Sequence, residues 1–154
     1  MQVEKCIEEI RNELELLESL LESHQELVEK ARLNEILSRV ELSAAATVLH
    51  SFYNGIENIF RRIANRIDKA CPSSEFWHQE LLEQMIKEEA FRPRVISDKL
   101  YDTMSMYLGF RHFFRHAYAF QFKWRKMEKL ILNIQDSFEQ FKEELSVFIS
   151  EMEK

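Results

Sequence analysis

Two arginines, two histidines and a tyrosine fall within eight consecutive residues, in the stretch RHFFRHAY. On an ideal helix, Arg111, His112, Arg115, His116 and Tyr118 share one arc, and the aromatic and apolar residues between them occupy the other. The polar arc holds no carboxylate, although solvated helices usually mix acidic and basic residues one turn apart. The pattern indicates a surface for an external anion, and phosphate matches the planar guanidinium group well.

Histidine beside arginine can cleave a phosphodiester when the substrate carries its own nucleophile, as RNA does in its 2′-hydroxyl group. Histidine exchanges protons near neutral pH, and arginine stabilises the charge that develops on the phosphate. The residue types therefore favour a metal-independent ribonuclease site. The alternative interpretation is a solubilising helix face, or a set of cations that pairs with the glutamates of the N-terminal segment.

Arg111 and His116 lie about 140° apart on a regular helix, so they cannot both point at one atom from a straight, isolated helix. Either the helix bends or ends within the cluster, or the groove is wide, or two copies of the chain combine their residues. Long apolar stripes near both ends of the chain favour the last option, and they predict a homodimer with a composite groove.

The elements that must hold this cluster are predicted to be helices. The chain has 154 residues, only two glycines and two prolines, and 45% hydrophobic residues, which disfavours both a turn-rich β fold and disorder. We expect one domain over residues 1–154, an antiparallel all-α bundle of about five helices. The expected helical segments are residues 3–30, 34–70, 74–90, 97–118 and 123–152.

Three single residues refine this helical prediction. Ser97 is expected to cap the fourth helix, because a serine hydroxyl can accept a hydrogen bond from the first helical turn. Gly55 interrupts a broad apolar face, so we expect another helix to approach closely there. His24 fills a gap in the first apolar stripe, and we expect it to be a packed or partly exposed seam residue rather than a ligand of a bound group.

Charge is distributed unevenly along the chain, whose net charge is -6. Residues 1–30 hold nine acidic and three basic residues, whereas residues 92–129 hold nine basic and three acidic ones. A basic segment in an acidic protein predicts a local anion site. No signal peptide or membrane span is evident, and Cys6 and Cys71 are isolated, so we expect a cytoplasmic protein without membrane association.

Arg111, His116 and Tyr118 form an R-x-x-x-x-H-x-Y motif that resembles the HEPN superfamily (higher eukaryotes and prokaryotes nucleotide-binding domain). The chain looks closest to the HepT-like ribonuclease toxins. The resemblance also covers FYNGIENIFRRIA, FWHQELLEQM and YLGFRHFFRHAY, and it spans about residues 49–118.

The resemblance implies a dimeric bundle of four to five helices that cleaves RNA without a metal or another cofactor, the motif of each subunit lining one cleft. It implies that Arg111 stabilises the scissile phosphate and that His116 transfers protons. Tyr118 matches the tyrosine that receives AMP from a cognate MNT-type nucleotidyltransferase antitoxin. The bulk and charge of AMP beside Arg111 would block RNA. Expected partners are therefore RNA, the antitoxin and a second copy of the chain, with a larger hetero-oligomer open.

Further residues are candidates for supporting roles. Substrate phosphates are expected to contact His112, Arg115 and Lys123. Glu57 and Asn58 could orient the motif side chains, and Glu57 could equally be an ordinary surface acid. His78 either reaches the cleft or packs against a helix, and Trp124 either stacks on bases or belongs to the core.

Three other functional classes compete with a ribonuclease. The main one is a non-catalytic HEPN-type module that binds nucleotides or partners; the intact pair of Arg111 and His116 argues for cleavage instead. A structural helical adaptor would explain the apolar stripes but leaves the carboxylate-free arc unexplained. A metal hydrolase is disfavoured, because HFFRH offers Phe113 where a metalloprotease motif places its glutamate.

Overall fold

The computed structural model describes residues 2–35 and 37–154, so Met1 and Ile36 lie outside it. The described residues form seven α-helices and no named β-strand, which confirms the predicted all-α fold. The α-helices are α1 (Gln2–Ser23), α2 (Gln25–Arg32), α3 (Arg39–Ile63), α4 (Trp77–Met85), α5 (Asp98–His116), α6 (Trp124–Leu132) and α7 (Ile134–Met152). A π-helical turn, η1 (Ala64–Asp68), extends α3, and a short 3-10 helix, η2 (Ala119–Gln121), follows α5.

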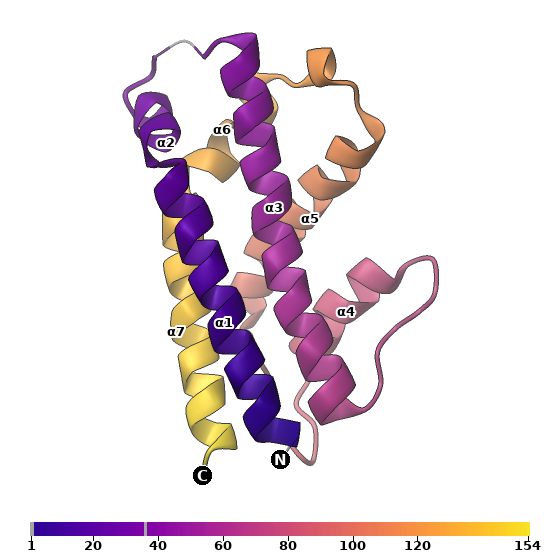
Figure 1. Ribbon diagram of the computed structural model, residues 1–154. Coiled ribbons are helices and arrows are strands. Elements are labelled where there is room, and N and C mark those ends of the chain that lie inside the picture. Colours follow the sequence, from indigo (N-terminus) through magenta and orange to yellow (C-terminus); the bar gives the residue numbers. More distant parts are fainter. Residues whose placement is uncertain (1, 36) are drawn as a thin grey trace.

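The long helix α3 is the centre of the bundle. It packs against α1, α4, α5 and α6, and α1, α3 and α7 run side by side along the long axis of the molecule (Figure 1). The core consists of apolar side chains at helical spacing, and its largest fully buried members include Tyr53, Tyr107, Phe52, Phe60, Phe138, Phe141 and Phe148. The hydroxyl group of Tyr107 donates a hydrogen bond to the carbonyl oxygen of Leu130 over 2.8 Å, which joins α5 to α6 inside this core.

Two segments that were expected to be single helices are each divided in two. The first divides at His24, which is half-buried and whose Nδ1 lies 2.9 Å from the carbonyl oxygen of Leu20. The second divides at Asn133, whose side-chain amide donates to the carbonyl oxygen of Lys129. After these breaks, α2 packs against α6 at one end of the bundle. His24 therefore ends a helix instead of continuing the seam.

The other boundaries also differ from the sequence prediction. The helix expected over residues 34–70 begins at Arg39, where Ser38 and Glu41 form a reciprocal capping box, and position 36 lies outside the described residues. The segment expected over residues 74–90 is helical only from Trp77 to Met85.

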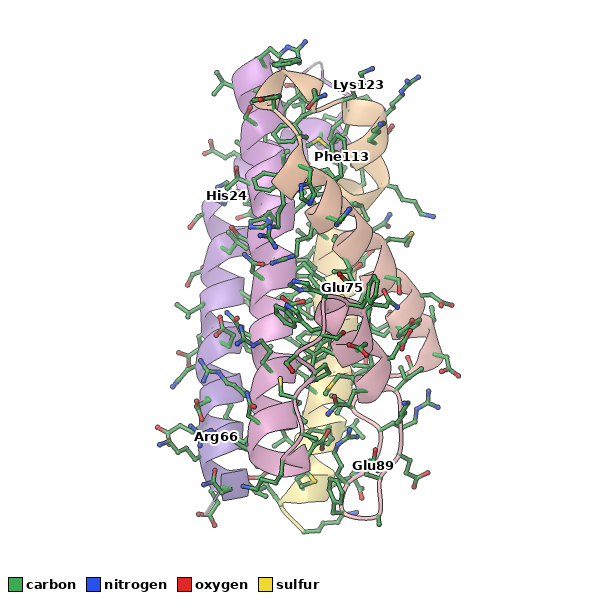
Figure 2. The ribbon with its side chains drawn as sticks, turned by 90° about the vertical axis from the view of Figure 1, so that its right-hand side faces the viewer. His24, Arg66, Glu75, Glu89, Phe113 and Lys123 are labelled. Atoms are coloured by element: carbon green, nitrogen blue, oxygen red, sulfur yellow. The ribbon has the colours of Figure 1, made fainter. Side chains whose placement is uncertain are left out.

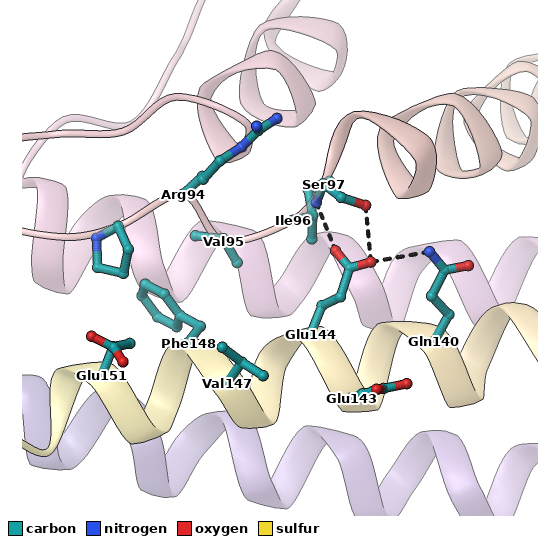
Figure 3. A pocket seen from close by; sticks show the side chains of 11 residues that line it. Arg94, Val95, Ile96, Ser97, Gln140, Glu143, Glu144, Val147, Phe148 and Glu151 are labelled. Carbon is teal, nitrogen blue, oxygen red and sulfur yellow. Dashed lines mark hydrogen bonds between the residues drawn. The ribbon is translucent and has the colours of Figure 1, made fainter.

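The start of α5 is fixed to α7. The hydroxyl group of Ser97 accepts a hydrogen bond from the backbone of Leu100, which confirms the predicted cap. Glu144 on α7 accepts hydrogen bonds from the backbone and the hydroxyl group of Ser97, at 2.6 and 2.9 Å (Figure 3). Because a carboxylate at a helix N-terminus is favourable, this contact sets where α5 begins its course toward the motif.

Gly55 lies at the crossing of α3 and α1. A Cβ atom at this position would lie 2.9 Å from Cγ of Leu17 and closer still to one of its methyl groups. The predicted close approach of a second helix is therefore confirmed. Among the described residues, no helix is both long enough and apolar enough to cross a membrane.

Candidate active site

The motif lies where α5 ends. The helix stops at His116, and both Ala117 and Tyr118 have extended backbone angles, with ψ of 146° and 154°. The helical wheel that placed Tyr118 beside Arg111 is therefore wrong, because Tyr118 is no longer on the helix. Arg111 and His116 both lie within α5, so the end of the helix after His116 moves Tyr118 off the helix but leaves these two residues on it.

Arg111 is half-buried against α3. Its Nε–H group donates a hydrogen bond to Oδ1 of Asn54 over 3.0 Å. The side-chain amide of Asn54 lies 3.1 Å from Nε2 of His50, one turn earlier on the same helix. Because arginine can only donate, Oδ1 of Asn54 accepts and its NH₂ group donates, so Nε2 of His50 carries no proton in this arrangement.

His50 is suited to staying neutral. Burial lowers the pKa of its imidazole, and the positive charges of Arg111 and Arg115 lower it further. The ring stacks on Phe114 of α5, with centroids 4.4 Å apart. Asn54 and His50 are therefore uncharged side chains that hold Arg111 in place. The positive charge of this three-residue group is that of the Arg111 guanidinium.

The remaining motif side chains are exposed. His112, Arg115 and His116 lie on the exposed side of the last two turns of α5, and the rings of His112 and His116 meet edge to face with centroids 4.9 Å apart. Tyr118 is 72% exposed. Two imidazoles, a guanidinium and a phenol therefore face solvent beside the half-buried Arg111.

The cations of this region are not neutralised within the chain. Over residues 2–35 and 37–154, no ion pair is formed by Arg111, Arg115, Lys123, Arg125, Lys126 or Lys129. Three of the α1 glutamates that the sequence offered as alternative partners bind other cations. Glu9 and Glu13 pair with Arg62 of α3, and Glu18 pairs with Lys142 of α7.

Lys123 immediately precedes α6 and is exposed at the same end of the molecule as Phe113, as Figure 2 shows. The ammonium group of Lys126 lies over the ring of Phe113, 5.0 Å from its centroid. Trp124 begins α6 and is partly buried against the core. The two ends of the α5–α6 connection therefore contribute cations and aromatic rings to one surface.

Glu57 is neither a surface acid nor a contact of the motif. It is only 4% exposed, and its carboxylate lies 2.7 Å from Nδ1 of His78 on α4. The ring of His78 stacks on Trp77, and the guanidinium of Arg61 lies over the same indole. The pair of Glu57 and His78 thus joins α3 to α4, one turn along α3 from the residue that holds Arg111.

Sequence reasoning named Asn58 as a supporting residue and missed Asn54. Asn58 is exposed and lines a shallow hollow with Arg61, Arg62 and Asn65. Asn54 is the amide that contacts the motif. The sequence feature that distinguishes Asn54 is an amide directly beside Gly55, the glycine at the expected helix crossing.

A separate pocket of about 520 Å³ lies between residues 93–97 and α7 (Figure 3). Its floor includes Val95, Ile96 and Phe148, and its lining includes Glu143, Glu144 and Glu151. These carboxylates would repel a phosphate, so the pocket does not suit the ligand that the motif suggests. Among the described residues, no group of three or more His, Cys, Asp or Glu side chains is placed to hold a metal ion.

Of three comparisons with known proteins, one found a match. A protein-family model described as HepT-like protein matches residues 44–152, which is more than half of the chain and includes the motif. Neither a curated protein nor a solved structure matches the chain. The match covers α4 to α7 and nearly all of α3, including Asn54 and every motif residue. The chain therefore belongs to the HepT-like family, which is of the HEPN type.

Proposed function

We propose that this protein is a metal-independent endoribonuclease and the toxin of a toxin–antitoxin pair. One observation carries the proposal: a half-buried Arg111 held by Asn54, without a carboxylate partner among the described residues, on the same last turns of α5 as the exposed His116. An unneutralised guanidinium beside an accessible imidazole suits a reaction in which a phosphate gains charge. Membership of the HepT-like family supports the same function.

In the proposed reaction, the 2′-oxygen of RNA attacks the adjacent phosphorus and the bond from phosphorus to the 5′-oxygen breaks. A base takes the proton of the 2′-hydroxyl group, and an acid returns a proton to the leaving 5′-oxygen. His116 performs one of these transfers, and Arg111 stabilises the negative charge on the phosphate. The products are a 2′,3′-cyclic phosphate and a 5′-hydroxyl end. His112, Arg115 and Lys123 bind neighbouring phosphates.

The proposed active unit is a homodimer. His116 alone cannot act as base and acid in the same step, so a second proton-transfer group is needed, and His112 or the His116 of a second copy is our candidate. Two copies that meet at the exposed end of α5 would supply both.

Tyr118 is the proposed site at which an MNT-type antitoxin transfers AMP. Its phenol is 72% exposed, which permits access for a modifying enzyme. A phosphodiester on this oxygen would bring negative charge and bulk to the surface that otherwise receives RNA. The modified protein would therefore be inactive.

The test is an RNA cleavage assay in EDTA that compares the wild type with His116→Ala, after mass spectrometry has verified that Tyr118 is unmodified. We expect wild-type cleavage to persist in EDTA, to yield cyclic phosphate or 3′-phosphate ends, and to vanish in the variant. Absence of cleavage by the unmodified wild type, or equal cleavage by the variant, would favour a non-catalytic binding module instead.

A further inference from the structure

An exposed pair of aromatic rings follows directly after the motif. The rings of Tyr118 and Phe120 stack with centroids 5.6 Å apart and an interplanar angle of 6°. They are 72% and 67% exposed. Large aromatic side chains are usually buried or at interfaces, so two parallel rings in solvent indicate a surface on which another flat group stacks.

This pair is held in a defined position by its backbone. The amide of Tyr118 donates to the side chain of Gln121 over 2.7 Å, and the amide of Gln121 donates back to the carbonyl oxygen of Tyr118 over 2.8 Å. Arg39 at the start of α3 donates from Nη1 to the carbonyl oxygen of Phe120, also over 2.8 Å. Figure 1 shows the connection after α5 beside the start of α3. Because the loop is already held in place, little conformational entropy is lost when a ligand stacks on it.

The charge around the pair matches a polyanion. No aspartate or glutamate occurs between Asp102 and Glu128, whereas this stretch holds five arginines and lysines. Three of them, Arg115, Lys123 and Arg125, are exposed within a few residues of the rings. Stacked aromatic rings among unpaired cations are the arrangement by which proteins bind single-stranded nucleic acid.

We propose that Phe120 and Tyr118 form a nucleobase-stacking subsite, which takes an unpaired base of single-stranded RNA next to the phosphate at Arg111. The proposal rests on the ribonuclease function proposed above and names its substrate class. A base in a duplex has both faces covered by its neighbours, so double-stranded RNA cannot use the subsite. Stacking contacts the face of a base and not the hydrogen-bonding edge that distinguishes one base from another. The subsite should therefore bind single-stranded RNA with little preference for its sequence.

The experiment measures binding separately from cleavage. Short single-stranded RNAs, each carrying 2-aminopurine at one position, are titrated with the full chain in the His116→Ala background. Stacking on an aromatic ring quenches 2-aminopurine, so we expect strong quenching at one or two adjacent positions. Phe120→Ala should weaken binding about tenfold and abolish the quenching. Phe120→Trp should restore both, which excludes misfolding as the cause.

Val40→Ala provides the matched control. Val40 is 79% exposed and follows Arg39, so it lies at the same end of the molecule without belonging to the ring pair. Its removal should leave affinity and quenching unchanged. A duplex of the same sequence should show no quenching.

Equal affinity and quenching in Phe120→Ala would overturn the subsite, and cleavage by unmodified wild-type protein in a parallel assay would show that the ribonuclease function still stands. Neither binding nor cleavage by unmodified wild type would overturn both. If Phe120→Ala leaves RNA binding intact but abolishes dimerisation or binding of a protein partner, the rings belong to a protein interface and the subsite is wrong.

Discussion

Arg111 on α5 donates a hydrogen bond to Asn54 on α3, and the two residues are 57 positions apart in the chain. The bond occupies Nε and leaves the Nη groups of the guanidinium for an anion. Since α3 is the central, largely buried helix of the bundle, this hydrogen bond fixes the position of the guanidinium relative to the core. A group held in this way meets the phosphate without first having to be ordered.

Asn54→Ala is expected to reduce kcat/KM for RNA cleavage by about 10- to 100-fold, because a misplaced guanidinium stabilises the transition state less well. Asn58→Ala is the matched control, since it removes the same side chain from the next turn of α3 at an exposed position. Thermal denaturation of both variants checks that the fold persists. Equal activity of the two variants would show that Asn54 does not position Arg111.

The support beneath Arg111 is expected to make stability depend on pH. Burial and the neighbouring arginines lower the pKa of His50 below its ordinary value of 6.5. Below about pH 6.5 the unfolded chain therefore binds a proton at His50 that the folded chain does not bind. The free energy of unfolding should fall as pH decreases through this range, and it should level off below the folded pKa.

His50→Gln removes this titrating group, so its free energy of unfolding should change less between about pH 7.5 and pH 5.5 than that of the wild type. Urea denaturation at several pH values measures the difference between the two slopes, which cancels the contribution of the other histidines. Parallel slopes would contradict the assigned role of His50.

The two glycines of the chain are expected to respond to alanine in opposite directions. Gly109→Ala adds a methyl group where no atom lies within 4 Å, so it should stabilise α5 by about 0.5–1 kcal/mol. Gly55→Ala forces Leu17 to move, and we expect a net loss of about 1–2 kcal/mol. Urea denaturation measures both changes. Stabilisation by Gly55→Ala would mean that α1 does not approach α3 as closely as described.

His78→Ala is expected to cost about 1–3 kcal/mol, because it leaves the buried carboxylate of Glu57 without its hydrogen-bond donor. His112→Ala removes an exposed imidazole and should change stability by no more than about 0.5 kcal/mol. Chemical denaturation compares the two variants. A similar, small effect for both would indicate that water replaces His78 at Glu57.

Tyr118→Phe should keep at least half of the cleavage activity, since the ring and its stacking on Phe120 remain. It should resist silencing by the proposed antitoxin, because the acceptor oxygen is gone. Incubation with the nucleotidyltransferase and ATP, followed by intact mass and activity measurements, tests both. A mass increase of one AMP on Tyr118→Phe would locate the modification elsewhere.

The sequence predicts those parts of this structure that depend on local pattern. Apolar periodicity predicts the all-α bundle. Ser97 predicts where α5 begins, and Gly55 predicts a close contact between two helices. The breaks at His24 and Asn133 escape prediction, because apolar residues continue at helical spacing across both. The breaks accompany a contact between α2 and α6, which are far apart in sequence.

For the candidate site, too, some features can be predicted from the sequence and others cannot. Its residue types are visible as a cluster without carboxylates, and the cations of the cluster form no ion pair among the described residues, in agreement with that pattern. The support of Arg111 is not visible, because it depends on how α3 packs against α5. The position of Tyr118 was missed for another reason: a helical wheel assumes that the helix continues, and no proline or glycine follows His116 to mark its end.

The ion pairs of α1 have a consequence for how the proposed RNA substrate would approach the protein. Glu9, Glu13 and Glu18 of α1 pair with Arg62, Arg66 and Lys142, whereas the cations around Lys123, at the opposite end from Arg66, form no ion pair among the described residues (Figure 2). In a chain of net charge -6, these unpaired cations make a local positive region at the motif. RNA would be repelled by the acidic remainder of the protein and attracted to this region at close range, so its association rate should fall steeply as salt screens the field.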